Sequence, residues 1–178
     1  MLIILAGLPG SGKTTIAREL ARQIGAVHVR IDSIEQAIRD SGAFSQAIND
    51  AGYRVGYAVA EDNLRLGRTV IADSVNPIAL TRDAWVAVAS RAHVGEIEVE
   101  VTCSDAKEHR QRVEKRTTDI CGLRPPTWQE VISRDYESWN RGRMVIDTAG
   151  QRVEETVQVL RGALSRTTRA ARSTPKAE

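Results

Sequence analysis

The residues from Gly7 to Thr14 read GLPGSGKT and match the spacing G-x-x-x-x-G-K-[ST]. Glycines in such a loop let successive backbone N–H groups point inward at phosphate oxygens, and the helix that follows adds its positive N-terminal end. Lys13 would then reach the β- and γ-phosphates of a nucleotide, and Thr14 would ligate Mg²⁺. A glycine-rich turn without a ligand is the alternative. The motif predicts a phosphate-binding loop made by Gly7, Leu8, Pro9, Gly10, Ser11, Gly12, Lys13, Thr14 and Thr15.

Two aspartates follow apolar runs further along the chain. Asp32 comes after VHVRI, and Asp73 ends TVIAD. Because ligands bind at the carboxyl ends of parallel strands, both carboxylates are expected to face the nucleotide. Asp73 has the form of an acid that holds Mg²⁺ after a buried strand, although a simple strand-terminating acid is the alternative. Asp32 also precedes a predicted helix, and Glu35 lies at capping-box spacing from it, so an N-cap is the alternative role for Asp32.

A cluster of arginines occupies the segment from 105 to 140. Arg112 and Arg116 are four residues apart and share one face of a predicted helix, and a loop with Gly122, Pro125 and Pro126 follows. A helix, a loop and a second helix with arginines on the near wall can close over a transferring phosphoryl group and stabilise its charge. A solvated surface helix is the alternative. We interpret residues 105–140 as a helical lid.

The elements that must position these residues alternate between apolar runs and longer stretches with helical spacing, which indicates an α/β fold with a parallel sheet. The predicted strands are 2–6, 27–31, 69–73, 97–103 and 143–147. The predicted helices are 14–24, 33–39, 46–66, 79–91, 105–117, 128–139 and 152–164. We expect one domain over residues 1–164 and a basic, disordered tail over 165–178.

Composition limits the class of protein. The chain has 178 residues, a net charge of +2 and no apolar run long enough to cross a membrane, so we expect a single cytoplasmic domain without a membrane partner. The nearly balanced charge argues against a dedicated duplex-DNA binder. Cys103 and Cys121 lack metal-ligand spacing and are expected to be free thiols.

The motifs described above, together with the segments HRQRVEKR and PTWQEVISRDYESW, resemble small P-loop kinases of the nucleoside-monophosphate-kinase type. The resemblance covers about residues 1–164 and is strongest to the predicted-kinase group related to chloramphenicol phosphotransferase and the polynucleotide kinase domain. It implies five strands in the order 2-3-1-4-5, Asp32 as the base toward an acceptor hydroxyl, and Arg112 and Arg116 on the ATP phosphates or near the adenine. Arg30 and the sequence DSVNP depart from the pattern of shikimate kinase.

The sequence therefore predicts an ATP- and Mg²⁺-dependent phosphotransferase that acts on a hydroxyl of a small molecule. The predicted catalytic residues are Lys13, Asp32, Arg112 and Arg116, and the predicted metal ligands are Thr14 and Asp73. One alternative is a 5′-hydroxyl polynucleotide kinase, although aromatic residues for base stacking make up only 4% of the chain. Another is a nucleotide-binding switch or ATPase that acts through a partner. Tyr53, Arg54, Tyr57 and Asn76 are candidates for the acceptor pocket, or for helix packing.

Overall fold

The computed structural model describes residues 1–42 and 47–173, and in this part of the chain it contains a five-stranded parallel sheet in the order β2-β3-β1-β4-β5. This confirms the predicted fold and strand order. The strands are β1 (Leu2–Ala6), β2 (Val27–Arg30), β3 (Val70–Asp73), β4 (Glu96–Thr102) and β5 (Met144–Asp147). The helices are α1 (Lys13–Ile24), α2 (Ile31–Asp40), α3 (Ala51–Arg65), α4 (Ala79–Arg91), α5 (Ala106–Glu114), α6 (Trp128–Ile132) and α7 (Val153–Ser173).

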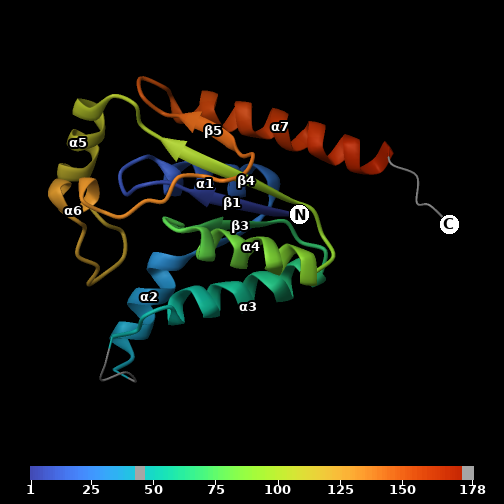
Figure 1. Ribbon diagram of the computed structural model, residues 1–178, viewed down its shortest axis with the longest axis horizontal. Coiled ribbons are helices and arrows are strands. Elements are labelled where there is room, and N and C mark those ends of the chain that lie inside the picture. Colours follow the sequence, from blue (N-terminus) through green and yellow to red (C-terminus); the bar gives the residue numbers. More distant parts are fainter. Residues whose placement is uncertain (43–46, 174–178) are drawn as a thin grey trace.

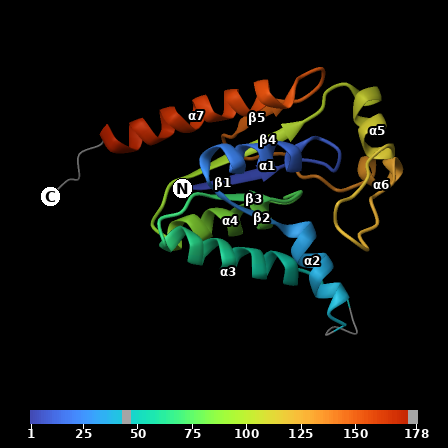
Figure 2. The same ribbon diagram turned by 180° about the vertical axis from the view of Figure 1, so that it is seen from behind.

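Two apolar layers hold helices against the two faces of the sheet (Figures 1 and 2). On one face, Ile3 and Leu5 of β1 pack with Leu20 of α1 and Leu160 of α7. On the other face, Leu2 and Ile4 pack with side chains of α3 and α4, including Trp85. The central strand β1 is completely buried, as its unbroken apolar sequence predicts.

The carboxyl ends of the strands point toward α5 and α6, which lie beyond that edge of the sheet (Figure 1). This places the loop after β1, the start of α2, the turn after β3 and the predicted lid segment around one region. Parallel connectivity alone produces this arrangement, because every strand of such a sheet ends on the same edge.

The structure corrects the predicted start of α2. The helix begins at Ile31, directly after β2, and its N-cap is Arg30, which makes no capping hydrogen bond through its side chain. Asp32 is therefore not an N-cap, and Glu35 pairs with Arg39 instead of completing a capping box. Asp32 lies in the first turn of the helix, where a carboxylate is favoured by the positive end of the helix dipole.

Several other helix boundaries differ from those predicted. The predicted helix 128–139 ends at Ile132, because the chain beyond it crosses to α4. The predicted helix 105–117 ends at Glu114. The last helix continues past the predicted end at Leu164 to Ser173, so part of the predicted tail is helical. α3 begins at Ala51 and not at 46, and residues 43–46 and 174–178 lie outside the described residues.

Within the described residues, both cysteines are free, as predicted. No helix there is long and apolar enough to span a membrane.

Candidate active site

The loop between β1 and α1 encloses the side chain of Lys13. Lys13 is only 7% exposed, and its Nζ donates a hydrogen bond to the carbonyl of Leu8, 2.9 Å away. Burial lowers the pKa of Lys13 to about 8, although the charges of Asp73 and Asp32 act in the opposite direction. The lysine is therefore a buried cation whose charge is poorly compensated, which favours the binding of an anion beside it.

Glycines are required in this loop because of its backbone and its close neighbours. Gly10 has a φ of 83°, and a Cβ there would lie 2.5 Å from the side chain of Val113. Behind it, the Nε2 atom of His109 lies 2.8 Å from the carbonyl oxygen of Pro9, and the ring packs edge-on against Trp128. His109 thus links α5 and α6 to the loop, a role that the sequence analysis missed.

The predicted loop residues do not all face the pocket. A pocket of about 1080 Å³ lies over the loop, and Pro9, Gly10, Gly12, Lys13, Thr14 and Thr15 line it. Gly7, Leu8 and Ser11 are not among the lining residues. The N–H of Gly7 donates to the carbonyl of Val75, so this amide ties the loop to the turn after β3.

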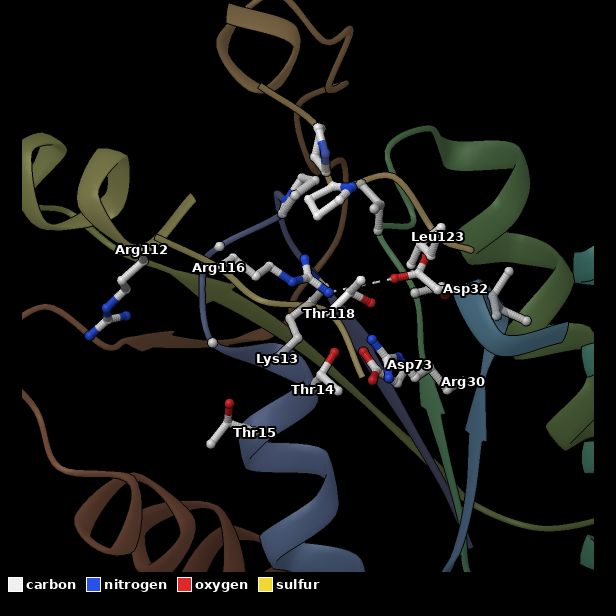
Figure 3. A pocket seen from close by; sticks show the side chains of 18 of the residues that line it. Lys13, Thr14, Thr15, Arg30, Asp32, Asp73, Arg112, Arg116, Thr118 and Leu123 are labelled. Atoms are coloured by element: carbon white, nitrogen blue, oxygen red, sulfur yellow. Dashed lines mark ion pairs between the residues drawn. The ribbon is translucent and has the colours of Figure 1, made fainter. Parts of the chain in front are cut away.

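Asp73 lies beside Thr14 and Lys13 at the end of β3 (Figure 3). It is 3% exposed, and its carboxylate lies 3.1 Å from Nε2 of His28. Burial acts to raise the pKa of Asp73, but the hydrogen bond with His28 and the charge of Lys13 outweigh it, so the pKa lies below its usual range. Asp73 is thus an ionised carboxylate beside a threonine hydroxyl.

This donor set fits Mg²⁺. The ion prefers oxygen ligands and is usually held by one or two carboxylates together with substrate phosphates and water. Thr14 and Asp73 supply a hydroxyl and a carboxylate next to the loop that would hold the phosphates. The described residues contain no group of three or more His, Cys, Asp or Glu side chains for an all-protein metal cage.

Asp32 and Arg116 lie near each other on the wall of the pocket that Lys13 also lines. The Arg116 guanidinium lies 4.0 Å from the Asp32 carboxylate, as the dashed line in Figure 3 marks. The Asp32 side chain is 42% exposed, whereas Asp73 is enclosed. Asp32 is therefore the carboxylate that a dissolved molecule can reach directly, and Arg116 brings a positive charge from the predicted lid to the same place.

Arg112 lies apart from this group and points away from it (Figure 3). Its guanidinium donates to the hydroxyl and the carbonyl of Thr148, at 2.7 and 2.9 Å, and pairs with Glu108. Thr148 in turn donates to the carbonyl of Ser11. Arg112 and Arg116 share a helical face in the sequence, but the end of α5 at Glu114 sends them to different parts of the pocket.

The turn after β3 is held by residues that the sequence analysis assigned otherwise or missed. Asn76 is fully buried, and its amide donates to the carbonyl of Leu5, so it is a structural residue. Arg82 is 1% exposed and donates to the carbonyls of Asn76, Pro77, Glu137 and Ser138. Its guanidinium also lies over the rings of Tyr136 and Trp139. Arg82 therefore joins α4, the turn and the predicted lid segment.

Of the other residues predicted for the acceptor pocket, the structure places one in the pocket and two outside it. Tyr53 lines the pocket. Tyr57 packs edge-on against Trp85, with ring centroids 4.6 Å apart, and Arg54 pairs with Asp50 on the surface. Only Tyr53 of these three is placed to touch a ligand in the pocket.

Comparison with known proteins agrees with this arrangement. The model of a family described as an AAA domain matches residues 2–121, which is more than half of the chain. The chain belongs to this family. None of the curated proteins matches it.

Solved structures show the same fold. A proposed kinase from Chloroflexus aurantiacus is 21% identical, with a TM-score of 0.69 over 90% of this chain and 96% of its own. The APS kinase CysC of Mycobacterium tuberculosis, solved in complex with AMPPNP and APS, is 19% identical, with a TM-score of 0.67 over 92% of this chain and 96% of its own. A gluconokinase from Sinorhizobium meliloti is 20% identical, with a TM-score of 0.66 over 95% and 94%. The fold is thus that of P-loop kinases.

Proposed function

We propose that this protein is a kinase that transfers the γ-phosphoryl group of ATP, with Mg²⁺, to a hydroxyl of a small molecule. The observation that carries this proposal is the presence of two separate carboxylates around one buried lysine. Asp73 and Thr14 lie on the side of the loop suited to Mg²⁺, and Asp32 lies open to the pocket with Arg116 beside it. A hydrolytic switch has no need of a second, accessible carboxylate in this position.

The two aspartates suit different tasks. Asp73 is engaged by His28 and by Thr14, and its lowered pKa makes it a weak base but a good partner for a cation. Among the described residues, the one ion pair of Asp32 is a long contact with Arg116, at 4.0 Å, so its oxygens can accept a hydrogen bond from an acceptor hydroxyl. We assign Asp32 as the residue that orients the hydroxyl and receives its proton, and Asp73 as a metal ligand.

The positively charged side chains of the site also have different roles. Lys13 and Arg116 both line the pocket, and both can stabilise the charge on the oxygens of the transferring phosphoryl group. Bound Mg²⁺ would neutralise charge on the β- and γ-phosphates. Arg112, fixed against Thr148 beside Gly12, belongs to the nucleotide end of the pocket and not to the acceptor end.

The test is transfer from ATP labelled at the γ-phosphate to a panel of small alcohols, nucleosides and 5′-hydroxyl oligonucleotides, with Mg²⁺ and with EDTA. We expect labelled product from at least one small alcohol, with Mg²⁺ only. Product from oligonucleotides alone would indicate a polynucleotide kinase. ATP binding and slow hydrolysis without any labelled acceptor would favour the switch and contradict the proposal.

A further inference from the structure

A second cationic site lies on the wall of the same pocket, formed by Arg18 of α1 and Arg30 at the end of β2. The Arg30 side chain is 6% exposed, although it carries a full positive charge. Arginine side chains are rarely buried to this extent unless they bind an anion, because removing the guanidinium from water is costly. The site therefore needs a negative partner.

In this structure the partner is Asp119. Its carboxylate lies 2.9 Å from one terminal nitrogen of Arg30 and also pairs with Arg18. Within residues 1–42 and 47–173, neither arginine forms an ion pair with a second acid. The hydrogen bonds from Arg18 and Arg30 hold the pKa of Asp119 well below its usual range, so the carboxylate stays ionised there.

Asp119 does not satisfy all the hydrogen-bond donors of Arg30. Its Nε is buried and has no hydrogen-bond partner in the described part of the chain. A guanidinium can bind a planar or tetrahedral oxyanion through two parallel N–H bonds, whereas Asp119 is engaged through a single nitrogen of Arg30. The Nε–H of Arg30 is thus a donor that Asp119 does not use and that an oxyanion bound in two-point fashion would use.

The two arginines and the aspartate differ in how firmly they are held. Arg18 and Arg30 are fixed on a helix and a strand of the central sheet. Asp119 lies between α5 and α6, in a segment without helix or strand, and its side chain is 50% exposed. Displacing Asp119 therefore moves a partly exposed side chain of this irregular segment, while the backbones of Arg18 and Arg30 stay in a helix and a strand.

Arg30 of this site lies close to Asp32, the residue proposed to contact the acceptor hydroxyl. Arg30 precedes Asp32 by two residues, so their Cα atoms are no more than about 7 Å apart. It also lies opposite Asp73 in the pairing of β2 with β3, and Figure 3 shows the two side chains together below Asp32. Arg30 and Asp32 also line the same pocket, so one molecule bound there lies between walls that carry both side chains.

We propose that the acceptor is an alcohol that also bears a carboxylate or phosphate group, and that this group binds Arg18 and Arg30 in the place that Asp119 occupies here. The anion site is independent of catalysis, but its assignment to the acceptor rests on the proposed kinase function.

Binding is tested on the full chain saturated with ADP and Mg²⁺, so that the phosphate-binding loop is filled. Calorimetry compares glycerate and glycerol 3-phosphate with glycerol, and gluconate with sorbitol. We expect at least one anionic compound to bind about tenfold or more tightly than its neutral partner, the scale of one charge-assisted hydrogen bond. The two acids matched to glycerol separate a carboxylate site from a phosphate site. Equal binding within every pair would overturn the proposal.

Variants then locate the site. Arg30→Gln and Arg18→Gln should each lose the preference for the anionic compound and keep ADP affinity. Arg22→Gln is the matched control, because Arg22 lies one turn beyond Arg18 and pairs with Glu19 on the surface. If Arg30→Gln does not fold, the more exposed Arg18→Gln still decides the question. A preference that survives in the folded Arg18→Gln or Arg30→Gln protein contradicts the proposal.

Asp119→Asn tests the displacement itself. Removing the competing carboxylate should tighten binding of the anionic compound about threefold or more, because the free site becomes more populated. Weaker binding in Asp119→Asn would show that Asp119 builds the site and does not compete for it. Anion binding without any phosphoryl transfer would refute the kinase assignment but support the anion site. Transfer to neutral alcohols alone would support the kinase assignment but refute the anion site as part of acceptor binding.

Discussion

The two ends of the pocket are built in different ways. The nucleotide end comes from one continuous stretch, in which residues 7–15 pass from β1 to α1 and Lys13 contacts the carbonyl of Leu8 within the same loop. The acceptor end is assembled from the start of α2, the turn after β3 and the predicted lid segment, which are far apart in the chain. The comparison teaches that the first end depends on local backbone geometry, whereas the second depends on tertiary contacts such as those of Arg82.

The strongest way to test the nucleotide end is Lys13→Ala. Loss of this buried charge should reduce phosphoryl transfer by about 10³-fold and weaken ATP binding, since the loop has no second cation in the same position. The fold should persist, because a lysine with a lowered pKa gains nothing from burial. Transfer assays, calorimetry and circular dichroism on one sample measure all three. Lys107→Ala, an exposed position on α5, is the control. Normal activity in folded Lys13→Ala would refute the phosphate-loop assignment.

The acceptor end is tested most sharply by Asp32→Asn. Transfer to the acceptor should fall by about 10²-fold, the scale of losing a general base, while ATP affinity stays unchanged. Stability should change little, since Asp32 is not a helix cap and its side chain is partly exposed. Single-turnover assays and calorimetry measure the two effects. Asp40→Asn, at the other end of α2, is the control. Retained turnover would move the base elsewhere, with Asp73 as the next candidate.

Arg82→Met tests whether tertiary contacts hold the acceptor end together. The substitution keeps much of the side-chain volume but removes the hydrogen bonds that the guanidinium donates to the carbonyls of Asn76, Pro77 and Glu137. We expect the free energy of unfolding to fall by about 2 kcal/mol, or about 30-fold in the folding equilibrium. Urea unfolding measures this. Arg91→Met, on the same helix but in a surface pair with Glu61, should change stability by less than about 0.5 kcal/mol. Equal effects of the two variants would contradict the structural role of Arg82.

Arg116→Ala tests how the predicted lid acts on the reaction. If this guanidinium meets charge mainly in the transition state, kcat should fall by about tenfold with little change in ATP affinity. Steady-state kinetics and direct ATP binding separate the two. Arg110→Ala is the control, since Arg110 lies on α5 and pairs with Glu114 at the surface. An unchanged kcat would make Arg116 a surface residue.

The smallest expected effect is a dependence of nucleotide binding on pH. The pKa of Lys13 is lowered to about 8, and bound phosphates would raise it, so binding takes up a proton above pH 8. ATP affinity should therefore fall a few-fold, and at most about tenfold, between pH 7 and pH 9. Calorimetry across this range measures it. Lys13→Arg keeps its charge throughout and should show a flat profile. An equally steep profile in Lys13→Arg would assign the titration to another group.

The sequence by itself determined the sheet and the nucleotide end of the pocket. An apolar run as short as Leu2–Ala6 that ends at a glycine loop predicts a buried strand, and glycines at fixed spacing before Lys13 and Thr14 predict a phosphate-binding loop, because this information is local. Strand order came from the family resemblance and was confirmed. The start of α6 is also local, since Thr127 and Glu130 form a capping box.

Only the tertiary structure decided the acceptor end. The helical pattern of 128–139 was overridden after Ile132, because Tyr136 and Trp139 lie against Arg82 and Glu137 accepts a hydrogen bond from the N–H of Ala79 at the start of α4. The pairing of Arg30 with Asp119 joins residues 89 positions apart, and the separate destinations of Arg112 and Arg116 depend on where α5 ends. Such contacts arise from distant parts of the chain that meet at one edge of the sheet, and no local pattern encodes them.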